Sequence, residues 1–292
     1  MSLRSYDLIV PPTSDGQTLK TYLRREIGIS ARSMTVLKYS GMGISRSGVE
    51  LRAHDILKAG DIVAIRLPAD KNDAEPVAGD LEILFEDDHL IVVNKPAGMP
   101  VHPVKVHQLD TLSNIVAFYQ RGRGEDYTFR ALNRLDKDTS GCVIIAKDRI
   151  AYTLVKPTVQ KTYIAVCEGI IPESGVIDAP IGLEAGSVIE RRVTSGGDSA
   201  VTHYRPVKYG NAHTMCEIWL ETGRTHQIRC HMSYIGHPLA GDDLYGGSLR
   251  YIQRQALHCK SVSFVHPGTG GRIELDTDIP GEFYRITDQG LS

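Results

Sequence analysis

Six short runs of β-branched and aromatic residues, each bounded by turn residues, dominate the chain from about residue 81 onward. They are LEILFEDD, LIVVNKP, CVIIAKD, TYIAVCEG, CEIWLET and SVSFVHP. Helical candidates are few in this region, namely residues 111–122 and part of 225–236. Because strands outnumber helices and do not alternate with them regularly, the pattern predicts an α+β domain. We expect a mixed, largely antiparallel sheet rather than a doubly wound one.

A smaller α+β unit precedes this domain. Residues 19–28 carry a helical apolar stripe that ends at Gly28. Residues 30–41 form a second expected helix, with Ser30 as its N-cap and Gly41 as its stop. Short β-like pieces and a KAGD turn follow, so the unit is expected to be two helices and a hairpin.

Charge is distributed unevenly along the chain, although the whole sequence has a net charge of only −2. Residues 1–67 carry ten Lys/Arg against six Asp/Glu, whereas residues 68–88 carry one Lys against eight acids. A basic module beside an acidic spacer is compatible with binding to a polyanion, and equally with an ordinary solvated surface. We therefore predict three parts: a small domain at 1–68, a charged Pro/Gly-containing linker at 69–80, and a larger domain at 81–292.

Composition excludes several classes of protein. No apolar run approaches the roughly 18 residues of a membrane span, and the N-terminus lacks the apolar core of a signal peptide, so the cytoplasm is the expected location. The five cysteines are scattered, with no Cys-x-x-Cys pair. This argues against a disulfide framework and against a thiolate zinc site.

The stretch ALNRLDKDTSGCVIIAKD, residues 131–148, contains the densest charge between segments that read as buried. Asp136 lies where one element ends and a tight turn begins, so its carboxylate is held rigidly yet stays reachable. Arg134 and Lys137 beside it favour the ionised form. Such a carboxylate can act as a nucleophile or a base, although an isolated motif of this kind is more often an aspartate that only caps a turn.

The stretch ETGRTHQIRCHM, residues 221–232, is the second dense cluster. On a helix, Arg229 shares a face with Thr225 and Met232 and can point into a pocket. The alternative is a zinc site formed by His226, Cys230, His231 and His237. No HExxH, Walker, GxGxxG or GxSxG motif accompanies this cluster.

Six motifs in this order resemble those of the RluA-type family of pseudouridine synthases: NKPAGMPVHP, RLDKDTSG, KTYIAVCEG, GRTHQIRCHM, GDDLYGG and ALHCKSVSFVHP. The resemblance covers about residues 81–280. The N-terminal unit more loosely resembles the S-four-type RNA-binding domain. The family isomerises a uridine in RNA: the glycosidic bond to the ring nitrogen breaks, the base rotates, and it rejoins through a ring carbon.

The resemblance implies a role for each matching residue. Asp136 is the essential aspartate, Arg229 the cation that pairs with it, and Tyr163 the tyrosine that packs on the base and can move a proton. Leu257 lines the base pocket, and Arg134 enters the RNA helix when the base flips out. No redox or hydrolytic step is involved, so no cofactor and no metal is expected.

The same resemblances imply roles for two residues of the N-terminal unit, and two features of the chain depart from the family's pattern. Arg32 and Lys38 are the expected phosphate contacts of the S-four-type unit. Asn133 stands where the family has His, and we expect it to change substrate contacts. The connection at 149–160 is shorter than the family's helical crossover, and Pro157 is expected to end its helix early. If that shortening moves Tyr163, activity is in doubt.

Three functions are compatible with the sequence. The first is a pseudouridine synthase acting on structured RNA, with 23S ribosomal RNA the first expected partner and transfer RNA the second. The second is a catalytically weak RNA-binding or ribosome-assembly protein that keeps the fold, and the third is a hydrolase of modified nucleosides. No membrane partner is indicated, and nothing in the sequence requires a dimer, so a monomer is expected.

Overall fold

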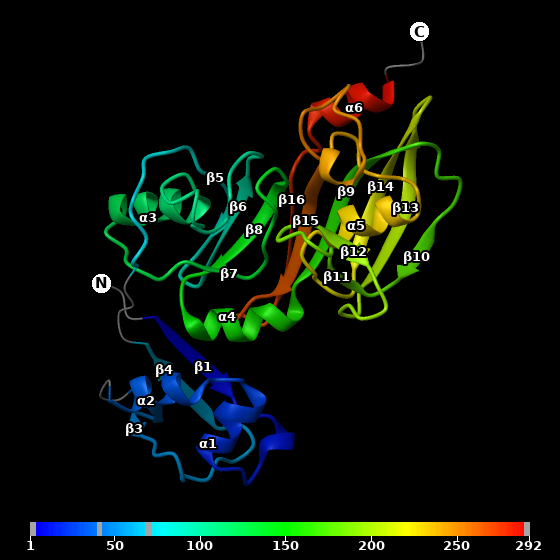
Figure 1. The fold of residues 1–292 in the computed structure, drawn as a ribbon. Coiled ribbons are helices and arrows are strands. Elements are labelled where there is room, and N and C mark those ends of the chain that lie inside the picture. Colours follow the sequence, from blue (N-terminus) through cyan, green and yellow to red (C-terminus); the bar gives the residue numbers. More distant parts are fainter. Residues whose placement is uncertain (1–3, 40–42, 68–71, 289–292) are drawn as a thin grey trace.

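The computed structural model describes residues 4–39, 43–67 and 72–288, and two sheets organise this part of the chain. Figure 1 shows a small N-terminal unit beneath a long sheet whose two halves meet at β8 (Ser140–Ala146) and β15 (Leu257–Val265). The α+β class and the largely antiparallel large sheet are as predicted. In the described residues, no helix has the length and apolar character needed to cross a bilayer.

The N-terminal unit is a four-stranded antiparallel sheet with two helical segments. Its strands, in the order β1-β4-β2-β3, are Ser5–Ile9, Ile62–Arg66, Ile44–Arg46 and Val49–Glu50. A short turn, η1 (Pro12–Ser14), precedes α1 (Leu19–Thr21), which continues as the wider turn η2 (Tyr22–Glu26), and α2 (Ala31–Tyr39) follows. The Ser30 hydroxyl accepts a hydrogen bond from the Ser33 N–H, as predicted for an N-cap. The predicted stop at Gly41 lies outside the described residues. Strand β1 was not predicted.

The large sheet follows the order β10-β13-β14-β9-β15-β8-β6-β5. Its strands are β5 (Glu82–Glu86), β6 (Leu90–Lys95), β8 (Ser140–Ala146), β9 (Gln160–Glu168), β10 (Gly175–Asp178), β13 (Val201–Tyr209), β14 (His213–Leu220) and β15 (Leu257–Val265), with β7 (Arg130–Ala131) paired to β8 and β16 (Arg272–Asp276) paired to β15. All six predicted runs are strands. Among the pairings of the described strands, only β8 with β15 is parallel.

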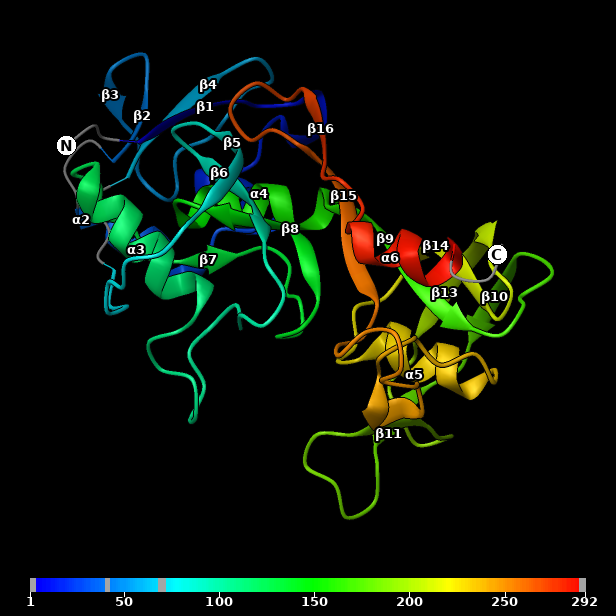
Figure 2. The same ribbon diagram turned by 90° about the horizontal axis from the view of Figure 1, so that it is seen from above.

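Helices and a small hairpin cover this sheet. They are α3 (Leu112–Gly122), α4 (Arg149–Val155) with the turn η3 (Lys156–Thr158), α5 (Gln227–Tyr234), η4 (Asp243–Tyr245) and α6 (Gly281–Asp288), and the hairpin β11 (Ile181–Leu183) and β12 (Arg191–Val193). Figures 1 and 2 show α3 at the β5–β6 end and α6 beside β9 and β14. The two predicted helices of this region, α3 and α5, are both present.

The parallel contact between β8 and β15 joins the two halves of the sheet at the end of the Asp136 loop. It is only two residue pairs long, His258 with Ser140 and Cys259 with Gly141. Gly141 has φ +113°, and a Cβ there would lie 2.3 Å from the Cys259 carbonyl oxygen. Only glycine permits this backbone and this close approach. The turn sequence after Asp136 therefore determines where the strands meet.

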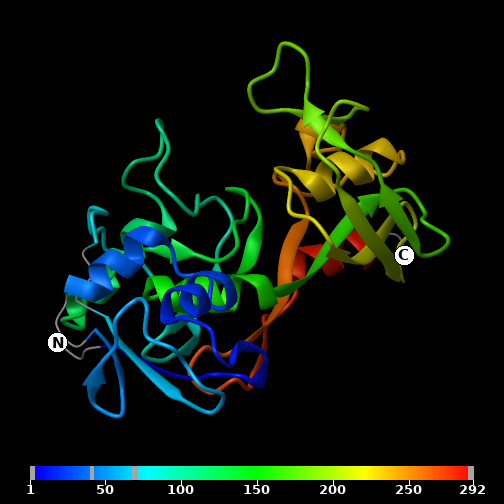
Figure 3. The ribbon, with the colours of Figure 1, turned by 90° about the horizontal axis from the view of Figure 1, so that it is seen from below.

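The N-terminal unit packs against the large domain through polar contacts. The Tyr6 hydroxyl donates to Asp148 at 2.6 Å and lies 3.0 Å from Nδ1 of His89. Arg4 donates to the carbonyls of Asp88 and Lys147, and Figure 3 shows the N-terminal unit beside α4. Within the predicted linker, residues 69–71 lie outside the described part. Residues 72–80 have no regular secondary structure and hydrogen-bond along α3, for example from Val77 N to Asn114 O.

His258 makes the β8–β15 junction sensitive to acid. Its ring lies between the hydroxyls of Ser140 at 2.8 Å and Thr277 at 2.7 Å. Burial, followed by the charges of Arg254 and Lys260, lowers the pKa of His258 to about 4. The folded protein therefore keeps this ring neutral where the unfolded chain already binds a proton.

We predict that the free energy of unfolding decreases as pH falls from about 6.5 to 4, by about 3 kcal/mol from this group at 1.36 kcal/mol per pKa unit. The sign follows because the unfolded state binds more protons than the folded state in this window. Denaturant unfolding at several pH values measures it. His258→Gln should flatten the slope, and the same change at exposed His54 is the control. An unchanged slope in His258→Gln would contradict the assignment.

Candidate active site

A buried lysine fixes the loop that carries Asp136. Lys95, at the end of β6, is fully buried, and its ammonium group donates to the carbonyls of Pro96 and Met99 at 2.7 Å and of Lys137 at 3.0 Å. Burial lowers the pKa of Lys95 to about 7. Three carbonyls use all three hydrogens of its charged form. The NKP turn and the Asp136 loop are thereby held together.

The rest of the loop is fixed from the other side. Thr139 N donates to the Asp136 carbonyl at 3.1 Å, which closes the turn. Arg254, just before β15, donates to the Asp138 carbonyl at 3.0 Å, and Gln255 donates to the Thr139 hydroxyl. Residues 136 to 139 all take part in these bonds, so the position of the Asp136 side chain is set by its backbone.

Arg229 brings two carboxylates together. From α5 it donates to Oδ2 of Asp136 at 3.2 Å, and it forms a two-pronged contact with Asp242 at 2.7 and 2.8 Å. The Asp242 side chain is fully buried, whereas that of Asp136 is 20% exposed. Burial alone would lower the pKa of the Arg229 guanidinium, but the two carboxylates raise it above its ordinary value. Arg229 is therefore always charged, and its guanidinium is held against the Asp136 carboxylate.

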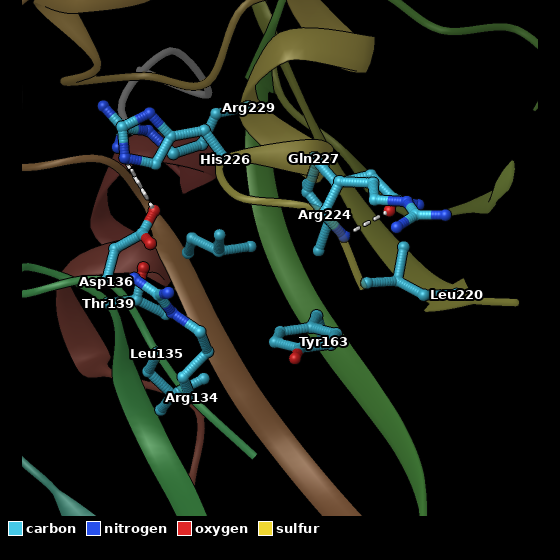
Figure 4. Close-up of a pocket in the computed structure, with 12 residues that line it drawn as sticks. Arg134, Leu135, Asp136, Thr139, Tyr163, Leu220, Arg224, His226, Gln227 and Arg229 are labelled. Atoms are coloured by element: carbon cyan, nitrogen blue, oxygen red, sulfur yellow. Dashed lines mark hydrogen bonds and ion pairs between the residues drawn. The ribbon is translucent and has the colours of Figure 1, made fainter. Parts of the chain in front are cut away.

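These groups line a pocket where the two halves of the sheet meet. Figure 4 shows the Asp136 carboxylate pointing toward Arg229 and His226. The lining residues are Arg134, Leu135, Asp136, Thr139, Tyr163, Leu220, Arg224, His226, Gln227, Ile228, Arg229 and Leu257. Cationic side chains, one carboxylate, and apolar and aromatic side chains all line this pocket, as expected for a site that binds a flat, polar ring.

Tyr163 and Leu257 are two of the buried side chains in the apolar part of this pocket. Tyr163 lies on β9 opposite Cys259 of β15, and both Tyr163 and Leu257 are only 5% exposed. Burial, followed by the neighbouring Cys259, raises the pKa of Tyr163 well above its ordinary value of 10. The hydroxyl therefore stays protonated at neutral pH, and the ring offers an aromatic surface rather than a base.

Comparison with known proteins agrees with this geometry. The family described as RNA pseudouridylate synthase matches residues 89–234. The uncharacterized RNA pseudouridine synthase YhcT of Bacillus subtilis (strain 168) is 38% identical over 293 residues, which cover 97% of this chain and 96% of that protein. The chain belongs to the RluA-type pseudouridine synthase family. It is therefore an RNA pseudouridine synthase, an intramolecular isomerase.

Two further relatives support this identification. Ribosomal large subunit pseudouridine synthase D of Pseudomonas aeruginosa is 38% identical over 257 residues, covering 81% of this synthase and 80% of that one. The solved structure of human RNA pseudouridylate synthase domain containing 1 superposes with a TM-score of 0.58 and 26% identity. It covers 70% of this chain and 86% of that chain. Both the sequence and the fold of the large domain thus match the family.

The structure of the synthase brings five of the predicted site residues into one pocket. Asp136, Arg229, Tyr163, Leu257 and Arg134 all line it, although they come from four separate parts of the chain. The shortened connection at 149–160 does not remove Tyr163 from this pocket. The helix α4 ends at Val155, and Pro157 lies in the following turn η3, as predicted. Arg32 and Lys38 lie elsewhere, exposed on α2.

Asn133 does not line the pocket, which corrects the expectation that it contacts the substrate. Its side chain is buried: Nδ2 donates to the Cys142 carbonyl at 3.0 Å, and Oδ1 accepts from Ile144 N at 2.9 Å. Both hydrogen-bonding ends are used to tie the approach to the Asp136 loop onto β8. An amide suits this position because one end donates and the other accepts.

The sequence interpretation missed Asp242. The GDDLYGG motif is recognisable as a turn with two acids, but nothing in its local pattern says which acid turns inward. In the structure Asp242 is 1% exposed and Asp243 is exposed. A buried acid is stabilised by a cation, and Arg229 in another of the six motifs is such a cation. The sequence therefore allowed the prediction that one acid of the GDDLYGG motif pairs with Arg229.

The zinc alternative is not supported among the described residues, where no three His, Cys, Asp or Glu side chains are arranged so that they could hold a metal ion. His231 uses both ring nitrogens, for Thr202 Oγ1 and the Ala179 carbonyl, each at 2.9 Å. His237 bonds to the Glu168 carbonyl. These residues stabilise the fold around α5.

We predict that Asp242→Asn lowers kcat by about 10- to 100-fold with little change in KM, because Arg229 loses the charged partner that aims it at Asp136. Steady-state kinetics on RNA that contains the target uridine measure this. Asp243→Asn is the matched control, since it changes an exposed acid one residue away. If Asp242→Asn had the kcat of the wild type, the position of Arg229 relative to Asp136 would not depend on the charge of Asp242.

Proposed function

We propose that this synthase modifies uridine in 23S ribosomal RNA, with Asp136 as the group that attacks or deprotonates the ribose of the target nucleotide. The observation that carries this proposal is the 3.2 Å contact between Arg229 and Oδ2 of Asp136, inside a pocket with an aromatic wall. Among the described residues, Oδ1 of Asp136 has no protein partner. That oxygen is available to the substrate, whether as nucleophile or as base.

The proposed reaction needs little beyond these groups. The bond between N1 of uracil and C1′ of ribose breaks, and a bond between C5 and C1′ forms. The proton lost from C5 is balanced by one gained at N1. Arg229 keeps the carboxylate charged and aimed while charge develops on the sugar and the base. All atoms of the substrate are retained, so no co-reactant is required.

The detached base must be held while it turns. Tyr163 and Leu257 offer a buried, flat wall on which uracil can stack, with the Tyr163 hydroxyl protonated. Stacking on an aromatic ring is worth roughly 1–3 kcal/mol per base. It does not require a fixed hydrogen-bond pattern, and it therefore tolerates rotation of the ring. We assign Tyr163 to this role rather than to proton transfer.

Arg134 is suited to the gap that a flipped base leaves in the RNA. It is exposed at the pocket edge and has no ion-pair partner among residues 4–39, 43–67 and 72–288. Unstacking a base costs a few kcal/mol. A guanidinium that stacks in the vacated space and contacts phosphates would offset part of that cost.

The N-terminal unit is proposed as a second RNA-binding surface. Arg24, Arg25, Arg32 and Lys38 are exposed on η2 and α2, and none of them forms an ion pair with another described residue. The buried contacts of Tyr6 hold this surface in a defined position relative to the pocket. The division into domains at 1–68 and 81–292 with a linker at 69–80 remains part of this proposal.

Ribosomal RNA is favoured over transfer RNA by two observations. One relative, named for the ribosomal large subunit, is 38% identical over 81% of this chain. The basic N-terminal unit adds a contact surface apart from the pocket, which suits a large structured RNA. A ribosomal RNA substrate would be met in the cytoplasm, and a monomer would suffice for the site as proposed.

We predict that deleting the gene removes one or a few pseudouridines from 23S ribosomal RNA. A wild-type copy should restore them, and an Asp136→Asn copy should not. Chemical mapping of pseudouridine in the three strains measures this, with thermal unfolding of the purified variant as the control for folding. Lost sites in transfer RNA would contradict the substrate class. No lost site anywhere would favour the catalytically weak RNA-binding protein, and release of free uracil in vitro would favour a hydrolase.

For the N-terminal surface, we predict that changing Arg32 and Lys38 together to Ala weakens RNA binding about equally for all sequences. The slope of log K against log salt should become shallower by about 2, because each phosphate contact contributes about one unit. Binding titrations over a salt series measure the slope. Arg52 and Lys58, exposed cations of the same unit, changed together to Ala are the control. If both double variants and the wild type gave equal slopes, α2 would not be part of the RNA-binding surface.

A further inference from the structure

His226 has an uncommon backbone conformation at the pocket. It directly precedes α5 with φ +56° and ψ +22°, and it is one of two non-glycine residues with positive φ among those described. A residue other than glycine adopts this left-handed conformation only uncommonly. Backbone strain of this kind is usually retained where a side chain must be aimed. Here the imidazole lines the pocket, and its side chain is only 11% exposed.

The hydrogen-bond network around His226 determines which ring nitrogen carries the proton. The Tyr245 hydroxyl oxygen accepts from Arg191 N at 2.9 Å and lies 3.0 Å from Nδ1 of His226. Burial raises the pKa of Tyr245 to about 12, so the hydroxyl keeps its hydrogen. Among the hydrogen bonds of the described residues, only the one to Nδ1 gives that hydrogen an acceptor. Nδ1 therefore accepts, and the ring N–H lies on Nε2.

This N–H faces the Asp136 carboxylate without bonding to it. Nε2 of His226 lies 3.7 Å from Oδ2 of Asp136, beyond the range of a hydrogen bond. Burial also lowers the pKa of His226, so the ring is neutral and carries a single hydrogen at neutral pH. The Nε2 hydrogen of His226 is thus a donor beside an acceptor, Oδ2 of Asp136. One oxygen atom of a substrate can hydrogen-bond to both of them.

We propose that His226 and Asp136 together bind the 2′-hydroxyl of the target uridine, and that His226 is the residue by which this enzyme requires ribose at that position. The hydroxyl donates its hydrogen to Oδ2 of Asp136 and accepts the Nε2 hydrogen of His226. Oδ1 of Asp136 remains free for the chemistry at the adjacent sugar carbons. This inference rests on the proposed role of Asp136.

The choice of the hydroxyl follows from the polarity of the two protein groups. A uracil carbonyl oxygen only accepts hydrogen bonds, so it would be repelled by the carboxylate oxygen 3.7 Å from Nε2. A hydroxyl both donates and accepts, so it can satisfy both partners at once. The 2′-hydroxyl is also the group that distinguishes RNA from DNA.

The test compares two amide variants on two matched substrates. Both variants carry an amide N–H donor. The Asn side chain of His226→Asn tolerates positive φ but is too short to reach the hydroxyl, whereas the Gln side chain of His226→Gln is one methylene longer. The substrates are RNAs that contain either uridine or 2′-deoxyuridine at the target position. Single-turnover rates and KM are measured for wild type and both variants, and thermal unfolding confirms that each variant is folded.

On the uridine substrate, we expect His226→Asn to lower kcat/KM by about 10- to 100-fold and His226→Gln to retain part of the rate. On the 2′-deoxyuridine substrate, where the hydroxyl is already missing, wild type should be slow and His226→Asn should lose little more. Equal losses on both substrates would overturn the proposal and leave His226 a structural residue. Failure of the proposed role of Asp136 is recognised separately, because Asp136→Asn would then turn over the uridine substrate normally.

Discussion

The candidate active site depends on one guanidinium shared between two carboxylates. Asp242 is fully buried and binds Arg229 with both carboxylate oxygens. The Arg229 guanidinium also contacts Asp136 at the pocket. Removing one partner of a buried pair costs about 3–5 kcal/mol, so the three side chains hold one another in place. The helix α5, the turn that contains Asp242 and the Asp136 loop must all adopt their positions for this contact to form.

The large sheet provides that arrangement. Strands β8, β15 and β9 are neighbours; β8 directly follows the Asp136 loop, while β15 carries Leu257 and β9 carries Tyr163. The parallel contact at Gly141 brings β8 against β15, and His258 bridges the hydroxyls on both sides of that contact. Rigid strands thus position the aromatic wall, while a tightly bonded loop positions the carboxylate. This division suits a reaction in which the sugar stays fixed and the base turns.

Local patterns explain which predictions about the fold succeeded. All six apolar runs of the large domain are strands, and both predicted helices of that domain are present, because each is bounded by its own turn or capping residues. Strand β1 was missed because it pairs with β4, for example Ile9 with Ile62, across both helical segments of the N-terminal unit. A pairing between such distant segments leaves no local signal. The docking of Tyr6 against Asp148 was missed for the same reason.

Residue chemistry and motif order determined the family and indicated Asp136 and Arg229 as the candidate aspartate and its cation, since these depend on residue types that recur in sequence. Only the tertiary structure decided what each polar side chain bonds to. It turned Asn133 onto the backbone of β8, buried Asp242 rather than Asp243 against Arg229, and placed the Tyr245 hydroxyl 3.0 Å from Nδ1 of His226. The physical reason is that a hydrogen bond or an ion pair needs its two partners within about 3 to 4 Å. Such proximity between distant parts of a chain exists only after the sheet has formed.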